Sequence, residues 1–159
     1  MPSETYVPNE LLSRLVGNRM YSVEFVLNDY VQFRFDGTPG AGSPVTLNSY
    51  VWPVVEVDAR SWRESDLGYA DALRRLTPGV VLSTSEATGT GLRVVLDTGS
   101  LLIKPNADEV YVEIAEIMGF HDGSWMVWRH GEDNFENLGG EPRGWPRPLE
   151  STIRPLVDP

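Results

Sequence analysis

The sequence predicts an α+β fold that is mainly antiparallel β-sheet, arranged as an open sheet or a partly open barrel with two short helices. Two observations predict this class. Short runs of alternating apolar and polar residues are separated by turn dipeptides, as in antiparallel strands, and a similar order of features occurs twice along the chain. The 159 residues are enough for one domain with its own hydrophobic core.

The first predicted elements are a short helix and a hairpin. Asn9 is a suitable N-cap for a helix over residues 10–16, which Gly17 would end. Apolar and polar residues then alternate on both sides of Asn28-Asp29. This period of two around a turn dipeptide predicts a β-hairpin.

The next segment holds a glycine-rich loop and one or two strands. Asp36 and Gly37 end the hairpin, and the loop GTPGAGSP follows. Residues 45–57 are largely apolar, which predicts strand structure with a break near Pro53, because proline cannot donate to a sheet.

The second helix is predicted after a polar stretch, with Ser65 or Asp66 as its cap and with Pro78-Gly79 as its end. Its predicted apolar residues are Leu67, Ala70, Leu73 and Leu76. The strands expected after it cover residues 80–85, 92–96, 101–104, 108–117 and 125–130, with a turn at 87–91 and a hairpin between the last two strands.

A constant spacing between landmarks predicts that the chain is a tandem duplication of a helix–hairpin–strand unit. The pairs Leu15–Leu76 and Asp36–Asp97 are each 61 residues apart, and Gly17–Gly79 and Gly37–Gly99 are each 62 residues apart. The units would cover about residues 9–64 and 65–130 of a single domain, 1–141. The alternative is coincidence, since leucine-rich helices that end at glycine are common. A tail over 142–159 is rich in proline and is expected to be extended, disordered or an irregular arm.

The composition excludes several classes of protein. The chain has no cysteine, so disulfides, cysteine-based zinc sites and thiol catalysis are excluded. No apolar run reaches the roughly 18 residues of a membrane helix, and the N-terminus has no signal-peptide pattern. We therefore expect a cytoplasmic protein without a membrane partner. The net charge of −10 makes nucleic acid a poor partner and favours a basic protein partner.

The familiar catalytic and cofactor motifs are missing. The glycine-rich loop has no lysine and leads into a strand, unlike a phosphate-binding loop. His121 and His130 have carboxylates beside them, and two histidines with a carboxylate could hold a metal. No HExxH pair or GxSxG elbow supports such chemistry, so we expect no enzyme, no cofactor and no metal.

The acidic residues are concentrated in the last third. Residues 105–141 hold nine acids against Arg129, which is −8 of the net charge, and aromatic residues lie among them. Aromatic anchors in an acidic field are typical of surfaces that bind basic proteins. The residues predicted to bind a partner are Glu109, Tyr111, Glu113, Asp122, Trp128, Glu132, Asp133 and Glu136. The alternative is a solvated face with its tryptophans in the core. Trp62, in a separate aromatic group, is either an exposed anchor or a lid packed on the sheet.

The pattern L-x-x-L-x-G followed by VEFVLNDYVQFRFDG, and later GLRVVLDTGSLLIKP, resembles an uncharacterised bacterial family of small two-repeat β-rich proteins. Many of its members are similar to immunity proteins encoded near secreted toxins. The resemblance covers residues 10–130 and implies a non-enzymatic binding module that neutralises a basic toxin domain. It implies no catalytic residue.

Two other functions remain open from the sequence. The chain could be a small-molecule-binding or enzymatic domain with its pocket where the two repeats meet. It could instead be a structural component of a larger assembly, with the tail as a tether. Both a monomer and a homodimer are compatible with the sequence.

Overall fold

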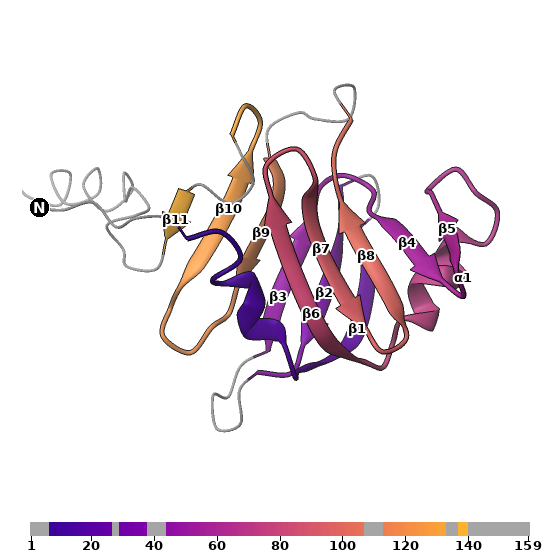
Figure 1. The fold of residues 1–159 in the computed structure, drawn as a ribbon, viewed down its shortest axis with the longest axis horizontal. Coiled ribbons are helices and arrows are strands. Elements are labelled where there is room, and N and C mark those ends of the chain that lie inside the picture. The colour runs from indigo at the N-terminus through magenta and orange to yellow at the C-terminus, as the bar shows by residue number, and fades with distance from the viewer. Residues whose placement is uncertain (1–6, 27–28, 38–43, 107–112, 133–136, 140–159) are drawn as a thin grey trace, which may run out of the picture.

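A computed structural model describes residues 7–26, 29–37, 44–106, 113–132 and 137–139. The described chain forms one antiparallel sheet of 11 strands in the order β11-β10-β9-β3-β2-β1-β6-β7-β8-β4-β5. A single α-helix and one 3-10 helix accompany the sheet in these residues (Figure 1). The predicted antiparallel sheet is therefore confirmed, and it is open. The fold is mainly β and not α+β, since the described residues contain one α-helix of only seven residues. The expectations for the glycine-rich loop and for the proline-rich tail fall largely or wholly outside the described residues.

The elements follow one another along the chain in two series. The first series is η1 (Leu12–Leu15), β1 (Arg19–Val26), β2 (Tyr30–Phe35), β3 (Val45–Ser49), β4 (Val54–Val57) and β5 (Arg60–Trp62). The second is α1 (Tyr69–Arg75), β6 (Gly79–Ala87), β7 (Gly91–Leu96), β8 (Gly99–Ile103), β9 (Glu113–Met118), β10 (Trp125–Arg129) and β11 (Asn137–Gly139).

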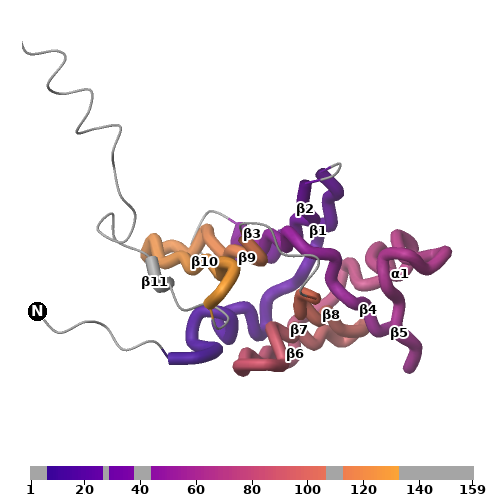
Figure 2. Tube along the Cα trace, turned by 90° about the horizontal axis from the view of Figure 1, so that it is seen from above, coloured from indigo at the N-terminus to yellow at the C-terminus, as the bar shows by residue number. Residues whose placement is uncertain are grey.

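The sheet folds over on itself between β1 and β6. These two strands share only the pairs Arg19↔Val80 and Met20↔Gly79. On one side of this bend lies layer A (β11, β10, β9, β3, β2 and β1), and on the other lies layer B (β6, β7, β8, β4 and β5). Figures 1 and 2 show the two layers lying over each other, so their inner faces enclose the core.

The core is built by the alternating apolar residues that predicted the strands. Phe33 of β2 and Leu47 of β3 come from layer A, while Val94 of β7 and Leu101 of β8 come from layer B. All four side chains are at most 1% exposed. The period of two therefore identified the inner face of both layers.

The predicted hairpins are confirmed. Strands β1 and β2 pair in register on both sides of the predicted turn, and β9 pairs with β10. The segment 45–57 forms two strands, which the break near Pro53 predicted. These two strands separate into different layers, since β3 pairs with β2 in layer A and β4 pairs with β8 in layer B.

The first helix differs from the prediction. Only Leu12–Leu15 is helical, as a 3-10 turn. Asn9 has a left-handed φ of 71°, and an N-cap residue needs an extended backbone. Its side chain instead bonds across the molecule to β6, where it donates to the Thr84 carbonyl at 3.1 Å and accepts from the Thr84 hydroxyl at 2.7 Å. The proposed cap at Asn9 is therefore wrong.

The second helix is also shorter than predicted, and it turns a different face to the core. Gly68 precedes it with a φ of 92°, so Leu67 lies outside the helix and is 96% exposed. Its buried side chains are Tyr69, Ala72, Leu73 and Leu76, whereas Ala70 is exposed. The prediction was correct for Leu73 and Leu76 and wrong for Leu67 and Ala70. Asp66 does not cap the helix, because its Oδ2 accepts from the Arg63 amide at 2.8 Å.

The same irregularity of strand pairing occurs at equivalent positions in the two layers. The pairing of β1 with β2 shifts between Met20 and Ser22, and that of β6 with β7 shifts between Val81 and Ser83, 61 residues later. The Asp36 amide donates to the Arg19 carbonyl, and the Asp97 amide donates to the Val80 carbonyl, both at 2.9 Å.

Layer A contains β1, β2 and β3 of the first series, and layer B contains β6, β7 and β8 of the second series. Each of these sets of three strands is extended by a hairpin from the other series. β9 and β10 extend layer A beyond β3, while β4 and β5 extend layer B beyond β8. The strand order therefore runs outward from the bend in the same way on both sides. Among the strands of the described ranges, β11 alone has no counterpart in layer B.

Candidate functional site

Trp128, predicted as a partner-binding residue, lies in the core. Its side chain is 6% exposed. The indole Nε1 donates to the Glu132 carbonyl at 3.0 Å, and the Glu132 carboxylate accepts from the Arg129 amide at 2.9 Å. Trp128 and Glu132 therefore shape the turn after β10, and the interpretation of Trp128 as a surface anchor needs correction.

Asp122 is held in the loop between β9 and β10. Its Oδ1 accepts from the Ser124 amide and its Oδ2 accepts from Arg14, both at 3.0 Å. The hydrogen bond from the Ser124 amide, with a smaller contribution from Arg14, lowers the pKa of Asp122 to about 2. Asp122 thus ties this loop to η1 as a permanent carboxylate.

The predicted acidic surface is divided in the structure. Glu113 begins β9 opposite Arg129 in register, and Glu132 follows β10 at the same end of this hairpin. Asp122 lies at the other end of the hairpin, so the structure does not bring it together with Glu113 and Glu132. Four predicted residues lie outside the described part of the chain: Glu109, Tyr111, Asp133 and Glu136.

A polar network crosses the outer face of layer A. The Gln32 amide donates to Asn48 Oδ1 at 3.0 Å, and Asn48 Nδ2 donates to Glu116 Oε1 at 2.9 Å. The Tyr50 hydroxyl also donates to Glu116 Oε1, at 2.5 Å. Burial, and then this hydrogen bond, raise the pKa of Tyr50 above its ordinary value, so the phenol remains a donor to Glu116.

Two pairs of aromatic side chains lie at or just beyond the end of the sheet where β1 and β3 finish and β2 begins. The rings of Tyr30 and Tyr50 are 5.4 Å apart, and those of Phe25 and Trp52 are 6.2 Å apart. Phe25 and Trp52 remain 41% and 40% exposed. Trp52 also contacts the buried Tyr69 edge-on at 6.1 Å, so a rigid neighbour supports it.

Phe25 is the cross-strand partner of the buried Val31, so it lies on the opposite face of the sheet from Tyr30, Tyr50 and Glu116. We call the residues around this end of the sheet the aromatic–acidic patch, and its members are Phe25, Tyr30, Tyr50, Trp52, Glu113 and Glu116. The sequence prediction identified Glu113, because it relied on the density of acids in the last third. It missed the aromatic members, which come from three earlier strand ends. The available signal was the position of Phe25 and Tyr30 on either side of a predicted turn.

Trp62 lies in β5, a strand that the sequence did not predict. Its ring packs against the core, and the Arg60 guanidinium lies 3.9 Å from the ring centroid. Of the two interpretations of Trp62, the structure supports the lid packed on the sheet.

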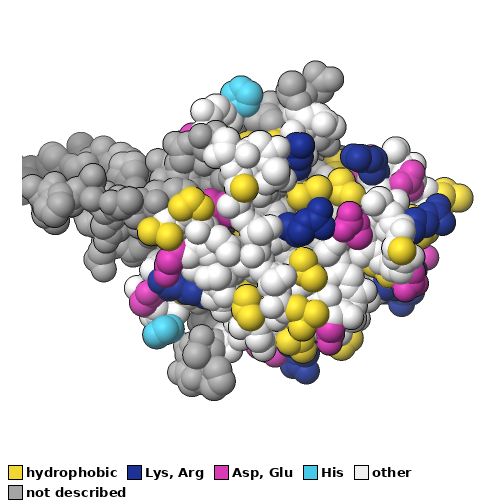
Figure 3. Space-filling view, in the orientation of Figure 1, with side chains coloured by type: hydrophobic (Ala, Val, Ile, Leu, Met, Phe, Trp, Pro, Cys, Tyr) yellow, Lys and Arg dark blue, Asp and Glu magenta, His cyan; other side chains and the backbone are white. Residues whose placement is uncertain are grey.

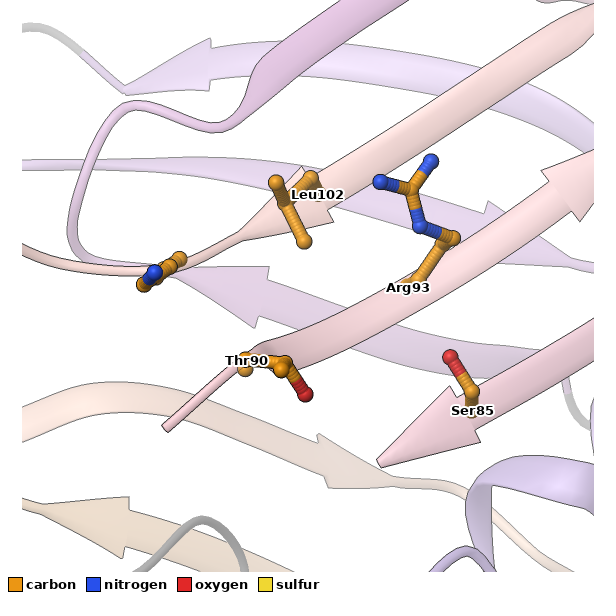
Figure 4. Close-up of a pocket in the computed structure, with 6 residues that line it drawn as sticks. Ser85, Thr90, Arg93 and Leu102 are labelled. Carbon is orange, nitrogen blue, oxygen red and sulfur yellow. The ribbon is translucent and has the colours of Figure 1, made fainter. Parts of the chain in front are cut away.

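One hollow among the described residues lies on the outer face of layer B, away from the junction of the repeats where the sequence allowed a pocket (Figure 4). Its volume is about 220 Å³. The residues that line it are Ser85, Thr90, Gly91, Arg93, Leu102 and Lys104.

The two histidines are not brought together. His121 precedes β10 and His130 follows it, and Figure 3 shows the two cyan side chains far apart on the surface. Within the described ranges, no three side chains of His, Asp or Glu form a group that could hold a metal. No helix in those ranges is both long and apolar enough to cross a membrane.

No protein-family model, no curated protein and no solved structure matches this chain.

Proposed function

We propose that this protein is a non-enzymatic binding module of the immunity type, which neutralises a basic bacterial toxin through the aromatic–acidic patch and acts in the cytoplasm. The observation that carries the proposal is the pair Phe25 and Trp52, which pack together and yet stay about 40% exposed. Large aromatic side chains held in place before binding are the usual anchors of protein interfaces, because little entropy is lost when they are buried.

The carboxylates of the patch support a basic partner. Both hydrogen bonds to Glu116 reach Oε1, so within the described part of the chain Oε2 receives no side-chain donor. An arginine or lysine of the partner could therefore bind Oε2 while its aliphatic stem packs on the tyrosine rings. Glu113 at the start of β9 adds negative charge that would speed the approach of a basic surface.

We also propose that the two halves of the chain arose by tandem duplication of a unit of about 60 residues, with residues 9–64 and 65–130 as the two copies. The shared register shift supports it, since Met20 and Val81 are 61 residues apart. The helical segments support it too, because Leu12 and Leu15 correspond to Leu73 and Leu76 at the same spacing, and all four are fully buried.

The test uses a toxin encoded by a neighbouring gene, in a catalytically inactive form, and measures binding by titration calorimetry. We expect Trp52→Ala to weaken binding by about 30-fold, in line with a hot spot of about 2 kcal/mol. Glu116→Gln should also weaken binding, and the affinity of this variant should depend less on salt concentration than that of the unmodified protein.

Tyr21→Ala is the matched control, because Tyr21 is an aromatic residue of β1 that is 41% exposed and lies at the opposite end of the strand from Phe25. It should change the affinity less than twofold. Equal affinities for the Trp52 and Tyr21 variants would show that the patch is not the binding surface. If the toxin fails to bind the unmodified protein, the proposed partner class is wrong.

A further inference from the structure

The hollow in layer B occupies the same register as the tyrosine pair in layer A. Tyr30 and Tyr50 are the residues next to the cross-strand pair Val31↔Ser49. Gly91 and Lys104 are likewise next to the pair Leu92↔Ile103. Two tyrosine rings, tilted by 56° to each other, thus cover the sheet in layer A, whereas a glycine and a lysine stand at the corresponding place in layer B.

The backbone of β8 lies close to position 91. Gly91 has a φ of +87°, and an added Cβ would lie 2.3 Å from the Ile103 carbonyl oxygen and 3.1 Å from Lys104 Cβ. No side chain fits at this position without a shift of β8. The close approach of β7 and β8 therefore requires glycine at position 91, and this residue lines the hollow without a side chain.

The charge of the surrounding surface is reversed between the layers. The row Glu24, Gln32, Asn48 and Glu116 crosses layer A. The row with the same register in layer B is Ser85, Arg93, Leu102 and Val54. Both acids of layer A are replaced by neutral residues, and the neutral Gln32 is replaced by the cation Arg93.

Hydrogen-bond donors remain available around the hollow. Arg93 uses Nη1 for both of its side-chain bonds, to Glu56 at 2.8 Å and to Ser100 at 3.4 Å. Its Nε and Nη2 have no partner among the residues described. Lys104 is exposed and forms no ion pair with that part of the chain. With Glu56 counted against Arg93, the site keeps one unit of positive charge on a protein of net charge −10.

Figure 4 shows how the labelled side chains are placed. Ser85, Arg93 and Leu102 come from three neighbouring strands, with Thr90 at the start of β7. The Thr90 hydroxyl donates to the Ala87 carbonyl at 3.0 Å, so it stabilises the turn. The Ser85 hydroxyl is exposed and lies on the side of its strand that faces Arg93.

We propose that this hollow binds a small oxyanion, a phosphate or carboxylate group, held by the Lys104 ammonium and the unpaired edge of the Arg93 guanidinium. The planar guanidinium of arginine can donate two hydrogen bonds to the oxygens of such a group, and the lysine ammonium adds a compact positive charge. The site is separate from the aromatic–acidic patch, and its ligand has the opposite charge to the ligand expected there.

The test is a titration of the ¹⁵N-labelled full chain followed by amide chemical shifts, with sodium phosphate, sodium acetate and sodium chloride at matched ionic strength. We expect saturable shifts at Ser85, Gly91 and Arg93 with phosphate or acetate and none with chloride. The tighter of the two probes identifies the group that the site prefers. Lys104→Gln should raise the apparent dissociation constant by about fivefold or more, because it removes the mobile cation of the site.

Arg63→Gln is the control, since it removes one exposed positive charge from the segment after β5. It should leave the dissociation constant unchanged. Shifts that stay linear with concentration, that also occur with chloride, or that respond equally to the Lys104 and Arg63 variants would overturn the proposal.

Discussion

At the scale of single residues, two glycines of layer B allow the cost of a left-handed backbone to be compared with the cost of a steric clash. Gly89 and Gly91 have similar φ values, +84° and +87°, but an added Cβ meets nothing within 4 Å at Gly89 and the Ile103 carbonyl at 2.3 Å at Gly91. Gly89→Ala should therefore lower the free energy of unfolding by about 1 kcal/mol, the cost of left-handed backbone. Gly91→Ala should lower it by about 2–4 kcal/mol, because β7 and β8 must also move apart. Urea denaturation of both variants measures the difference, and equal losses would contradict the close approach of the two strands.

Asp122 provides a residue-scale prediction about pH. Its folded-state pKa of about 2 lies below the ordinary value of 3.8. The carboxylate therefore contributes stability above pH 3.8, and the contribution is lost as the pH falls towards 2. Since the side chain is 44% exposed, the contribution should stay below about 1 kcal/mol.

The cause of the low pKa of Asp122 can be tested with Arg14→Gln, followed by the carboxyl carbon shift of Asp122 against pH. The Ser124 amide is the larger cause, so the pKa should stay below its ordinary value in this variant. A return to the ordinary value would show that the ion pair with Arg14 dominates.

At the scale of elements, α1 shows how much a helix boundary matters. Leu73 is 0% exposed and Leu67 is 96% exposed, although both carry the same side chain in one short segment. Leu73→Ala should lower the free energy of unfolding by about 2–5 kcal/mol, because it leaves a cavity between the helix and the sheet. Leu67→Ala should change it by less than about 0.5 kcal/mol. Thermal or urea denaturation tests this contrast, and similar losses for both would place the start of the helix before Gly68.

The strands were predictable from the sequence, and the short helices only partly. Phe33 and Val94 lie in runs with a period of two, which is a strong signal because one face of each strand is buried. The helix around Leu73 has only seven residues. A pattern of two turns does not show which side chains face the core, and the sequence did not show that the helix begins only after Gly68. β5 has three residues, and its only sequence signal was the unexplained Trp62.

The candidate site was less predictable because it depends on pairings between distant segments. Glu116 receives bonds from residues 66 and 68 positions away in the chain, and no local pattern reports such contacts. Trp128 was misassigned because composition gives the density of acids and aromatics along the chain and cannot tell the inner from the outer face of β10. The register of β9 with β10 decides that question.

At the scale of the whole molecule, the exchange of hairpins between the layers should make folding cooperative. β4 completes layer B and β9 completes layer A, although each comes from the other series of strands. Neither series of strands can therefore keep its full set of strand neighbours if the other series unfolds. The inner faces also share one core, so both layers should unfold in a single transition.

The prediction can be tested with equivalent core substitutions in the two layers. Leu47 and Leu101 are at most 1% exposed and lie on β3 and β8. Leu47→Ala and Leu101→Ala should each lower the free energy of unfolding by about 2–5 kcal/mol, while Leu82→Ala, at a residue that is 56% exposed, should change it by less than about 0.5 kcal/mol. In each core variant, amide signals from both layers should disappear at the same urea concentration, because each layer contains strands from both series of the chain. Loss of layer B signals in the Leu101 variant while layer A signals persist would show that the layers are independent units despite the exchanged hairpins.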